Sequence, residues 1–292
     1  MKVKAKKVNA FTDSIKGGNP AGVVLNSPDL TDKQMAYITK QLKVSETAFV
    51  FPSNKANFKI RFFSPEIEVD LCGHATIATF FTMALEGLLP NNNNNLVVRQ
   101  ETKAGILPVT IEFSDDGKVN RVMMAQKKPI LKDIYLDICE IADSLKISVD
   151  KIDNSLPKKS VSTGLFTLPV CIESFEILKS IKPDFEKIKK ICNKLDVGSF
   201  HLFTFETLEP RSIYHARNFA PLYGINEDPV TGTANGAVCS YLLINNVIHE
   251  NNLICEQGDI IGRSGRVFVD VNKNAVNVGG KAKIVQEKEI VI

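Results

Sequence analysis

The sequence predicts an α+β fold of two pseudo-symmetric lobes, each a mostly antiparallel sheet wrapped around a central helix, with a candidate active site in the cleft between lobes. Three observations lead to this prediction. A strand–loop–helix unit occurs twice, residues 75–88 and 234–245 are apolar on nearly every helical face, and most other segments alternate apolar and polar residues. We expect an N-terminal lobe at residues 1–116, to which the segment 281–292 can return, and a C-terminal lobe at 117–280.

The repeated unit is the strongest of these observations. Residues 61–65 (Arg-Phe-Phe-Ser-Pro) match residues 217–221 (Arg-Asn-Phe-Ala-Pro), and each copy leads through acidic residues to a Gly-led helix start. These starts are residues 72–76 (Cys-Gly-His-Ala-Thr) and 231–235 (Thr-Gly-Thr-Ala-Asn), and the second copy has a longer loop. A shared Arg-x-Phe-x-Pro, followed by Gly-x-Ala and an apolar helix, indicates duplication rather than chance. Two copies imply two similar lobes, and a substrate would fit between them.

Turn residues, caps and alternation place the remaining elements. Thr31 and Gln34 predict a capping box for a helix that reaches Leu42, with Leu30 and Met35 as its hydrophobic staple. Five consecutive asparagines at 91–95 predict a solvated loop. Residues 263–266 predict a hairpin turn between strands 259–262 and 267–271. Further strands are expected at 2–11, 21–25, 48–51, 57–63, 107–113, 119–125, 199–206 and 212–219, and amphipathic helices at 134–145 and 184–195.

Composition narrows the possible functions. The 292-residue chain has a net charge of +3 with its basic residues spread along its length, so it lacks the basic patch of a nucleic-acid-binding protein. No apolar run approaches the length of a membrane span, and the N-terminus has no signal-peptide core, so we expect a cytoplasmic protein. The six cysteines include no Cys-x-x-Cys pair, which favours free thiols. The four histidines show no ligand spacing, which argues against a metal site.

The two Gly-led helix starts suggest how a ligand is held. A helix N-terminus exposes unpaired amides and a partial positive charge, and glycine lets the backbone approach a ligand closely. Gly73 and Gly232 therefore predict a cradle for a substrate carboxylate, which could also stabilise an enolate. The alternative is that each glycine only permits a tight turn. For one site alone that alternative would be preferred, but the repetition favours the cradle.

Three ionisable residues are candidates for chemistry. Glu46 lies among apolar neighbours, so its carboxyl should be partly desolvated and suited to proton transfer, although a solvated turn residue is the alternative. His74, inside the first repeated motif, could shuttle a proton or hydrogen-bond a substrate, or it could only cap the helix. Asp228 precedes the second helix start, where it either stabilises the helix or holds a substrate amine or hydroxyl.

Several motifs together resemble a known family. In order along the chain they are residues 9–12, 18–21, 45–47, 61–65, 68–76 and 227–234. They resemble the phenazine biosynthesis PhzF-like family, which has the diaminopimelate epimerase-like fold. The resemblance spans the chain and implies a homodimeric isomerase that acts without cofactor. The family's named enzyme moves a proton between ring carbons of trans-2,3-dihydro-3-hydroxyanthranilate.

The resemblance also implies roles for individual residues. Glu46 would be the general acid/base, and His74 and Asp228 would bind and polarise the substrate. The remaining substrate-binding positions would be Thr233, the backbone amides of Gly73 and Gly232, and Asn19, which would line the site.

The chain departs from the wider superfamily in its cysteines. Epimerases and racemases of this fold use a cysteine at each helix start, whereas this chain has Cys72 at the first start and Thr231 and Thr233 at the second. A two-thiol racemase is therefore disfavoured, and Cys72 is interpreted as a packed thiol. Two alternatives stay open. One is an amino-acid epimerase or racemase that uses Glu46 with Asp228 or Cys72 as a second base, and the other is a non-catalytic carboxylate-binding protein.

Overall fold

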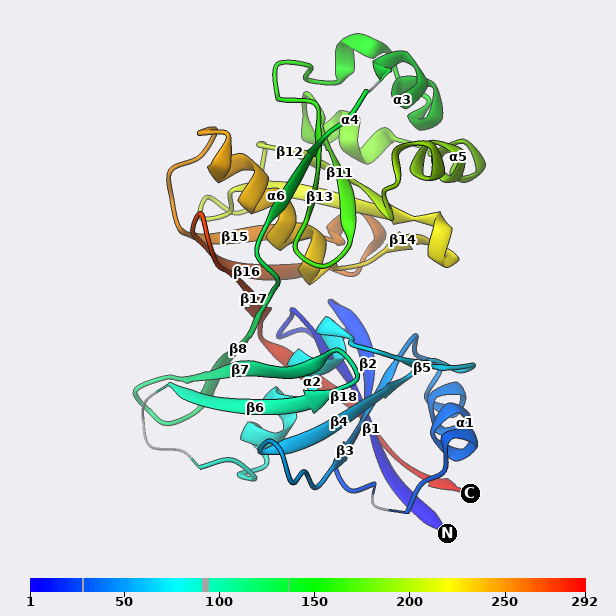
Figure 1. Cartoon of the computed structure of the whole chain (residues 1–292), viewed down its shortest axis with the longest axis vertical. Coiled ribbons are helices and arrows are strands. Elements are labelled where there is room, and N and C mark those ends of the chain that lie inside the picture. Colours follow the sequence, from blue (N-terminus) through cyan, green and yellow to red (C-terminus); the bar gives the residue numbers. More distant parts are fainter. Residues whose placement is uncertain (28, 91–94, 136) are drawn as a thin grey trace. The chain divides into compact units, whose positions relative to one another are not determined.

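The chain folds into two compact units in a computed structural model that describes residues 1–27, 29–90, 95–135 and 137–292 (Figure 1). The first unit comprises Met1–Ala125 and Gly279–Ile292, and the second comprises Gln126–Val278. Most of the predicted asparagine loop, residues 91–94, lies outside the described residues. None of the helices in the described part of the chain has the length and apolar character that a membrane span needs.

The first unit is a mostly antiparallel sheet around one helix. Its strands follow the order β18, β1, β2, β3, β4, β6, β7, β8, in which the β2–β3 and β4–β6 pairs are parallel and the others are antiparallel. The strands are β1 (Lys2–Ala10), β2 (Asn19–Val24), β3 (Thr47–Phe51), β4 (Phe58–Phe63), β5 (Glu68–Val69), β6 (Leu96–Thr102), β7 (Gly105–Phe113), β8 (Val119–Ala125) and β18 (Ala282–Val291). The helices are α1 (Asp32–Leu42) and α2 (Gly73–Leu85).

The central helix of this unit is α2. Every residue from Ala75 to Met83 is buried, and the helix packs against β1, β2, β3, β7, β8 and β18. This confirms the sheet-wrapped helix expected from an all-apolar segment. The other helix, α1, begins at the predicted capping box, in which Thr31 and Gln34 bond reciprocally. Its buried side packs with Leu30 and Met35 into a separate cluster on β1 and β3.

The second unit repeats this plan with more helices. Its sheet follows the order β9, β10, β11, β12, β13, β15, β16, with parallel pairs at β11–β12 and β13–β15. The strands are β9 (Ile130–Asp133), β10 (Lys159–Ser162), β11 (Phe166–Cys171), β12 (Ser199–Thr204), β13 (Tyr214–Ala220), β14 (Ile225–Asp228), β15 (Asn252–Gln257) and β16 (Gly265–Val271), and β17 (Val276–Gly280) crosses the division between the units. The helices are α3 (Ile138–Leu145), α4 (Phe175–Ser180), α5 (Phe185–Leu195) and α6 (Gly232–Ile244), with 3₁₀ turns at Val149–Lys151, Pro221–Tyr223 and Asp259–Ile261.

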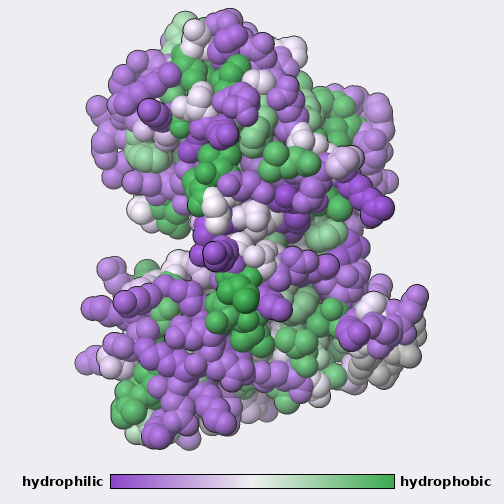
Figure 2. All heavy atoms as spheres, turned by 180° about the vertical axis from the view of Figure 1, so that it is seen from behind, coloured by the Kyte–Doolittle hydropathy of each residue, from purple (hydrophilic) through white to green (hydrophobic). Residues whose placement is uncertain are grey.

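The counterpart of α2 in this unit is α6. Its residues Ala234–Leu242 are all buried, and the helix packs against β10, β11, β12 and β16. A second apolar cluster joins α3, α4 and α5 to β11, β12 and β13. Hydrophilic residues cover most of the molecular face shown in Figure 2, with hydrophobic residues interspersed, as fits a chain with 24% charged residues.

Some elements differ from the sequence expectations. The predicted strand 259–262 is wrong, because Asp259–Ile261 forms a 3₁₀ turn and the partner of β16 is β15. Gly258 and Gly262, which flank the turn, have φ of 89° and 70°, and such left-handed residues break an extended strand. The helix expected from residue 134 starts at Ile138, after β9. The first unit extends to Ala125, beyond the boundary drawn at residue 116, since β8 pairs with β7.

Candidate functional site

The duplicated motif builds both helix starts in the same way. The Arg61 guanidinium donates to the two carboxylate oxygens of Glu68 at 2.8 and 2.8 Å, and that of Arg217 donates to Glu227 at 2.9 and 2.8 Å. Such bidentate pairs fix the carboxylate in direction as well as distance. From these two glutamates, residues 68–76 align with 227–235 without a gap. The repeat is therefore structural, with one arginine anchoring the segment that precedes each central helix.

Both central helices begin with uncapped amides. The N-cap residues Cys72 and Thr231 are extended, and neither side chain bonds the first turn. The first backbone amides to bond back are those of Thr76 and Asn235, which donate to the N-cap carbonyls at 3.0 and 3.1 Å. The three amides before each of them have no acceptor within their own helix. Each helix start thus offers a cluster of donors with a partial positive charge.

The surroundings of Gly73 bear on whether the glycine at a helix start permits a tight turn or gives a ligand access to the backbone. A Cβ added at Gly73 would meet only Met124 Cε, at 3.6 Å, which is ordinary van der Waals contact. Gly73 is also absent from the glycines with positive φ. Among the residues that the structure describes, neither packing nor backbone geometry therefore requires glycine here. The absence of a side chain leaves the Gly73 amide open to close approach by another group.

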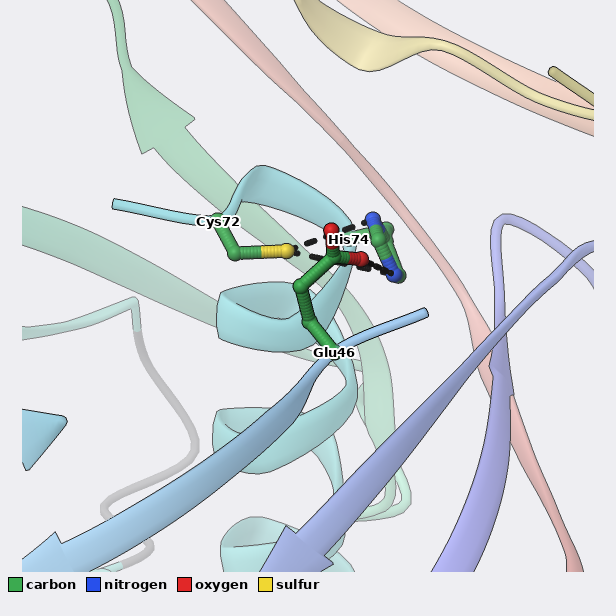
Figure 3. Close-up of side chains that lie close together, drawn as sticks. All are labelled: Glu46, Cys72 and His74. Atoms are coloured by element: carbon green, nitrogen blue, oxygen red, sulfur yellow. Dashed lines mark hydrogen bonds and ion pairs between the residues drawn. The ribbon is translucent and has the colours of Figure 1, made fainter. Parts of the chain in front are cut away.

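Glu46, Cys72 and His74 form a cluster at the start of α2 (Figure 3). His74 Nε2 lies 3.4 Å from Glu46 Oε2, and Cys72 Sγ lies 3.4 Å from His74 Nδ1. The side chains of Glu46 and His74 are 21% and 14% exposed, and Cys72 is buried. The structure therefore brings together two residues predicted as catalytic and a thiol that the sequence suggested was only packed.

The backbone beneath Glu46 is tightly held. The Gly22 amide donates to the Glu46 carbonyl at 2.9 Å, and the next residue, Thr47, begins β3 and is fully buried. A Cβ at Gly22 would lie 2.2 Å from Thr47 Oγ1, so β2 and β3 meet here too closely for any larger residue. The Glu46 carboxyl thus projects from a rigid strand end towards an imidazole. A carboxyl and an imidazole at this separation can pass a proton to a bound molecule.

The second helix start carries a hydrogen-bonded network instead of a histidine. Thr231 Oγ1 donates to Asp228 Oδ2 at 2.5 Å, and the Thr231 amide donates to Gln257 Oε1 at 3.0 Å. Gln257 Nε2 donates to the Asp228 carbonyl at 2.8 Å. Asn235 Nδ2 donates to both Gln257 Oε1, at 2.8 Å, and the Thr231 carbonyl, at 2.9 Å. The Asp228 carboxylate therefore accepts from Thr231, and the Thr231 hydroxyl in turn accepts from Gln257 Nε2 at 3.2 Å.

The remaining predicted residues occupy defined positions. Asn19 is the first residue of β2 and is buried. Thr233 is the second residue of α6, at the position that His74 has in α2, and its carbonyl accepts from Thr163 Oγ1 at 3.2 Å. Gly232 opens α6 as Gly73 opens α2.

Sequence reasoning missed Gln257 and the association of Cys72 with His74. Gln257 is the last residue of β15. Its buried side chain therefore comes from a different element than Asp228 and Thr231, which it supports. The only sequence signal was a glutamine directly before Gly258. For Cys72 the signal was stronger, because a thiol two residues before a histidine at a helix start can reach its ring. Donor atoms of Glu46, Cys72 and His74 all lie within 4.8 Å of one another, so these residues could hold a metal ion.

Comparison with known proteins gives one consistent family. Residues 8–288 match the family model described as phenazine biosynthesis-like protein. The uncharacterized isomerase YfhB of Bacillus subtilis is 37% identical over 95% of this chain and 92% of its own length. The uncharacterized isomerase YddE of Escherichia coli K12 is 32% identical over 99% of this chain and 98% of its own length.

Solved structures agree with this result. A phenazine biosynthesis protein of the PhzF family from Bacillus anthracis is 33% identical, with a TM-score of 0.91 and full coverage of both chains. A hydroxyproline epimerase from Agrobacterium vitis, 11% identical over 99% of this chain and 91% of that chain, shares the fold at a TM-score of 0.62. The match along nearly the whole sequence, the relatives named as isomerases and the shared fold lead to one conclusion: the chain belongs to the phenazine biosynthesis-like PhzF family and is an isomerase.

Proposed function

We propose that this isomerase moves a proton on a small carboxylate substrate without a cofactor, and that Glu46 is the general acid/base. The observation that carries the proposal is the placement of the Glu46 carboxyl, 3.4 Å from His74 Nε2 in the first turn of α2 and within 4.8 Å of Cys72 Sγ at its N-cap. The proton donor or acceptor, the polarising group and the anion holder therefore lie within one small region of the first unit.

Each group has a defined task in this proposal. The amides at Gly73 bind the substrate carboxylate, and they stabilise the negative charge that develops when an adjacent carbon loses its proton. His74 hydrogen-bonds the substrate and shares the proton with Glu46. Asn19 lines this part of the site. Cys72 receives no task in the proton transfer.

The second helix start supplies further binding groups. We assign Asp228, fixed by Thr231, to a substrate amine or hydroxyl, and we assign Thr233 and the Gly232 amide to a second polar contact. Thr233 replaces a histidine at the equivalent position, which leaves the first helix start as the place of proton transfer. The substrate class is closest to that of trans-2,3-dihydro-3-hydroxyanthranilate isomerase, by family resemblance.

Solvent deuterium exchange tests the proposal. The protein is incubated in D₂O with trans-2,3-dihydro-3-hydroxyanthranilate and with a panel of cyclic and amino-bearing carboxylates, and deuterium uptake is followed by NMR. We expect uptake into at least one compound, and we expect Glu46→Gln to reduce it by a factor of about 10²–10⁴. Glu289→Gln is the matched control, because Glu289 is 50% exposed and pairs with Lys2 on the strands β18 and β1.

The outcomes separate the alternatives. Exchange that persists in Glu46→Gln removes Glu46 from its role. Exchange accompanied by inversion of single amino acids, seen by chiral chromatography, identifies an epimerase or racemase instead. Calorimetric binding of a carboxylate with no exchange in the unmodified protein identifies a binding protein.

A further inference from the structure

We propose that Glu46, Cys72 and His74 form a binding site for Zn²⁺, and that the bound ion blocks proton transfer. Zn²⁺ binding is inferred from the geometry of these three residues alone. The block of proton transfer also rests on the proposed function of Glu46. The histidine content gave no hint of such a site, because its three ligands come from different residue types on two separate elements.

The chemistry of the three side chains matches zinc. Zinc in proteins is held by cysteine sulfur, histidine nitrogen and carboxylate oxygen, and the cluster provides one of each. A thiolate among the ligands favours zinc over magnesium or calcium, which prefer oxygen alone. Three protein ligands leave a fourth position open for water or another small ligand, as in zinc sites that are not purely structural.

The distances are close to those of a zinc site. With zinc bonds of about 2.0–2.3 Å, the ligand atoms of a tetrahedral site lie roughly 3.3–3.8 Å apart. His74 Nε2 lies 3.4 Å from Glu46 Oε2 and 3.9 Å from Cys72 Sγ, although the sulfur is nearer to His74 Nδ1, at 3.4 Å. Figure 3 shows the three side chains pointing towards one another. On binding, we expect the His74 ring and the other two side chains to rotate so that all three donors reach one ion.

The surroundings favour binding with little rearrangement. Cys72 is buried, Glu46 and His74 are 14–21% exposed, and their backbones belong to the N-cap of α2, its first turn and the residue before β3. The positive end of α2 opposes a cation with roughly half an elementary charge. Two anionic ligands, the thiolate and the carboxylate, outweigh that charge. An ion held here would take the Glu46 oxygen that the proton transfer requires.

Cobalt titration tests the site directly. Co²⁺ takes the place of Zn²⁺ and gives an intense near-ultraviolet thiolate-to-cobalt charge-transfer band when cysteine is a ligand. We expect this band to saturate at one ion per chain, and Zn²⁺ to displace the cobalt. Cys72→Ala should abolish the band and weaken Zn²⁺ binding, measured by equilibrium dialysis, by more than about 100-fold, since loss of even an outer partner costs 10–100-fold. Cys139→Ala, which removes an exposed thiol in the second unit, should leave both unchanged.

The result that overturns the proposal is a wild-type protein without the band, or a band that Cys72→Ala retains. Deuterium exchange is measured in parallel, with Zn²⁺ and with a chelator. We expect Zn²⁺ to suppress exchange in the wild type and not in Cys72→Ala. A charge-transfer band in a protein that shows no exchange under either condition would refute the proposed function and leave the zinc site standing. If saturating Zn²⁺ does not slow deuterium exchange, the proposal that the bound ion blocks proton transfer is refuted.

Discussion

The two anchoring arginines make a prediction that compares equivalent positions within one chain. Arg217 is only 7% exposed, pairs with Glu227, and also donates to the carbonyls of Leu178 and Ile181, each at 3.0 Å. Arg61 is 23% exposed, and its partner Glu68 has a second cation, Lys103, at 3.1 Å. Replacing each arginine by methionine keeps most of the apolar stem and removes the charge. The two substitutions should therefore have very different costs.

The expected magnitudes follow from these partners. Arg217→Met removes a buried guanidinium and leaves two carbonyls and the Glu227 carboxylate, which is 16% exposed, without their donor; breaking a pair with a buried member in this way costs about 3–5 kcal/mol. Arg61→Met removes a more exposed guanidinium and leaves Glu68 paired with Lys103, so we expect a loss of about 1 kcal/mol. Lys103→Met should destabilise the Arg61→Met variant more than it destabilises the wild type. In that variant Lys103 is the cation that still pairs with Glu68.

Urea denaturation followed by circular dichroism measures these free energies of unfolding, and peptide-resolved hydrogen exchange assigns each loss to one unit. We expect faster exchange in α4, β13 and β14 for Arg217→Met, and in β4 and β5 for Arg61→Met. Equal losses for the two arginines, or a larger loss for Arg61, would refute the reasoning that burial and the absence of a substitute cation determine the cost.

Three further predictions address single positions. Burial lowers the pKa of His201 from 6.5 to about 4, so as the pH falls the unfolded chain takes up a proton before the folded protein does. The free energy of unfolding should therefore decrease by up to about 3 kcal/mol as the pH falls from 6.5 to 4. His201→Gln should flatten this pH dependence in urea titrations. Gly22→Ala places a Cβ 2.2 Å from Thr47 Oγ1 and should destabilise the protein by about 2 kcal/mol, and an unchanged melting temperature would contradict it. Gln257→Leu leaves the Thr231 amide without its acceptor and the Asp228 carbonyl without its donor, and it should cost about 2 kcal/mol in the same urea titrations; an unchanged free energy of unfolding would contradict this.

The sequence predicted those parts of the fold that depend on local pattern. The capping box at Thr31 and Gln34, the two all-apolar helices and the duplicated Arg-x-Phe-x-Pro segments could be recognised because each is a short, contiguous signal. The prediction of a strand at residues 259–262 was wrong because it also relied on a short local pattern. Its residues suit a strand, but the left-handed glycines on either side place it in a 3₁₀ turn.

The candidate site was predictable in its residues and less so in its contacts. Glu46 and His74 were identified from motifs, yet their separation of 3.4 Å depends on the packing of α2 against β3, which are more than 20 residues apart in the sequence. The role of Gln257 depends on β15 lying beside β13, a parallel pairing that no local pattern reveals. Side-chain networks of this kind follow from tertiary structure, so sequence reasoning can name the candidates but not connect them.

The return of β18 to β1 has a consequence for synthesis of the protein. These strands pair from Lys2–Val291 to Ala10–Ala282, so the sheet of the first unit is completed only by residues that follow the entire second unit in the chain. On the ribosome, the second unit can fold while β1 still presents an open edge. The alternating Lys2, Lys4 and Lys6 place charges along that edge, a feature that discourages intermolecular strand pairing.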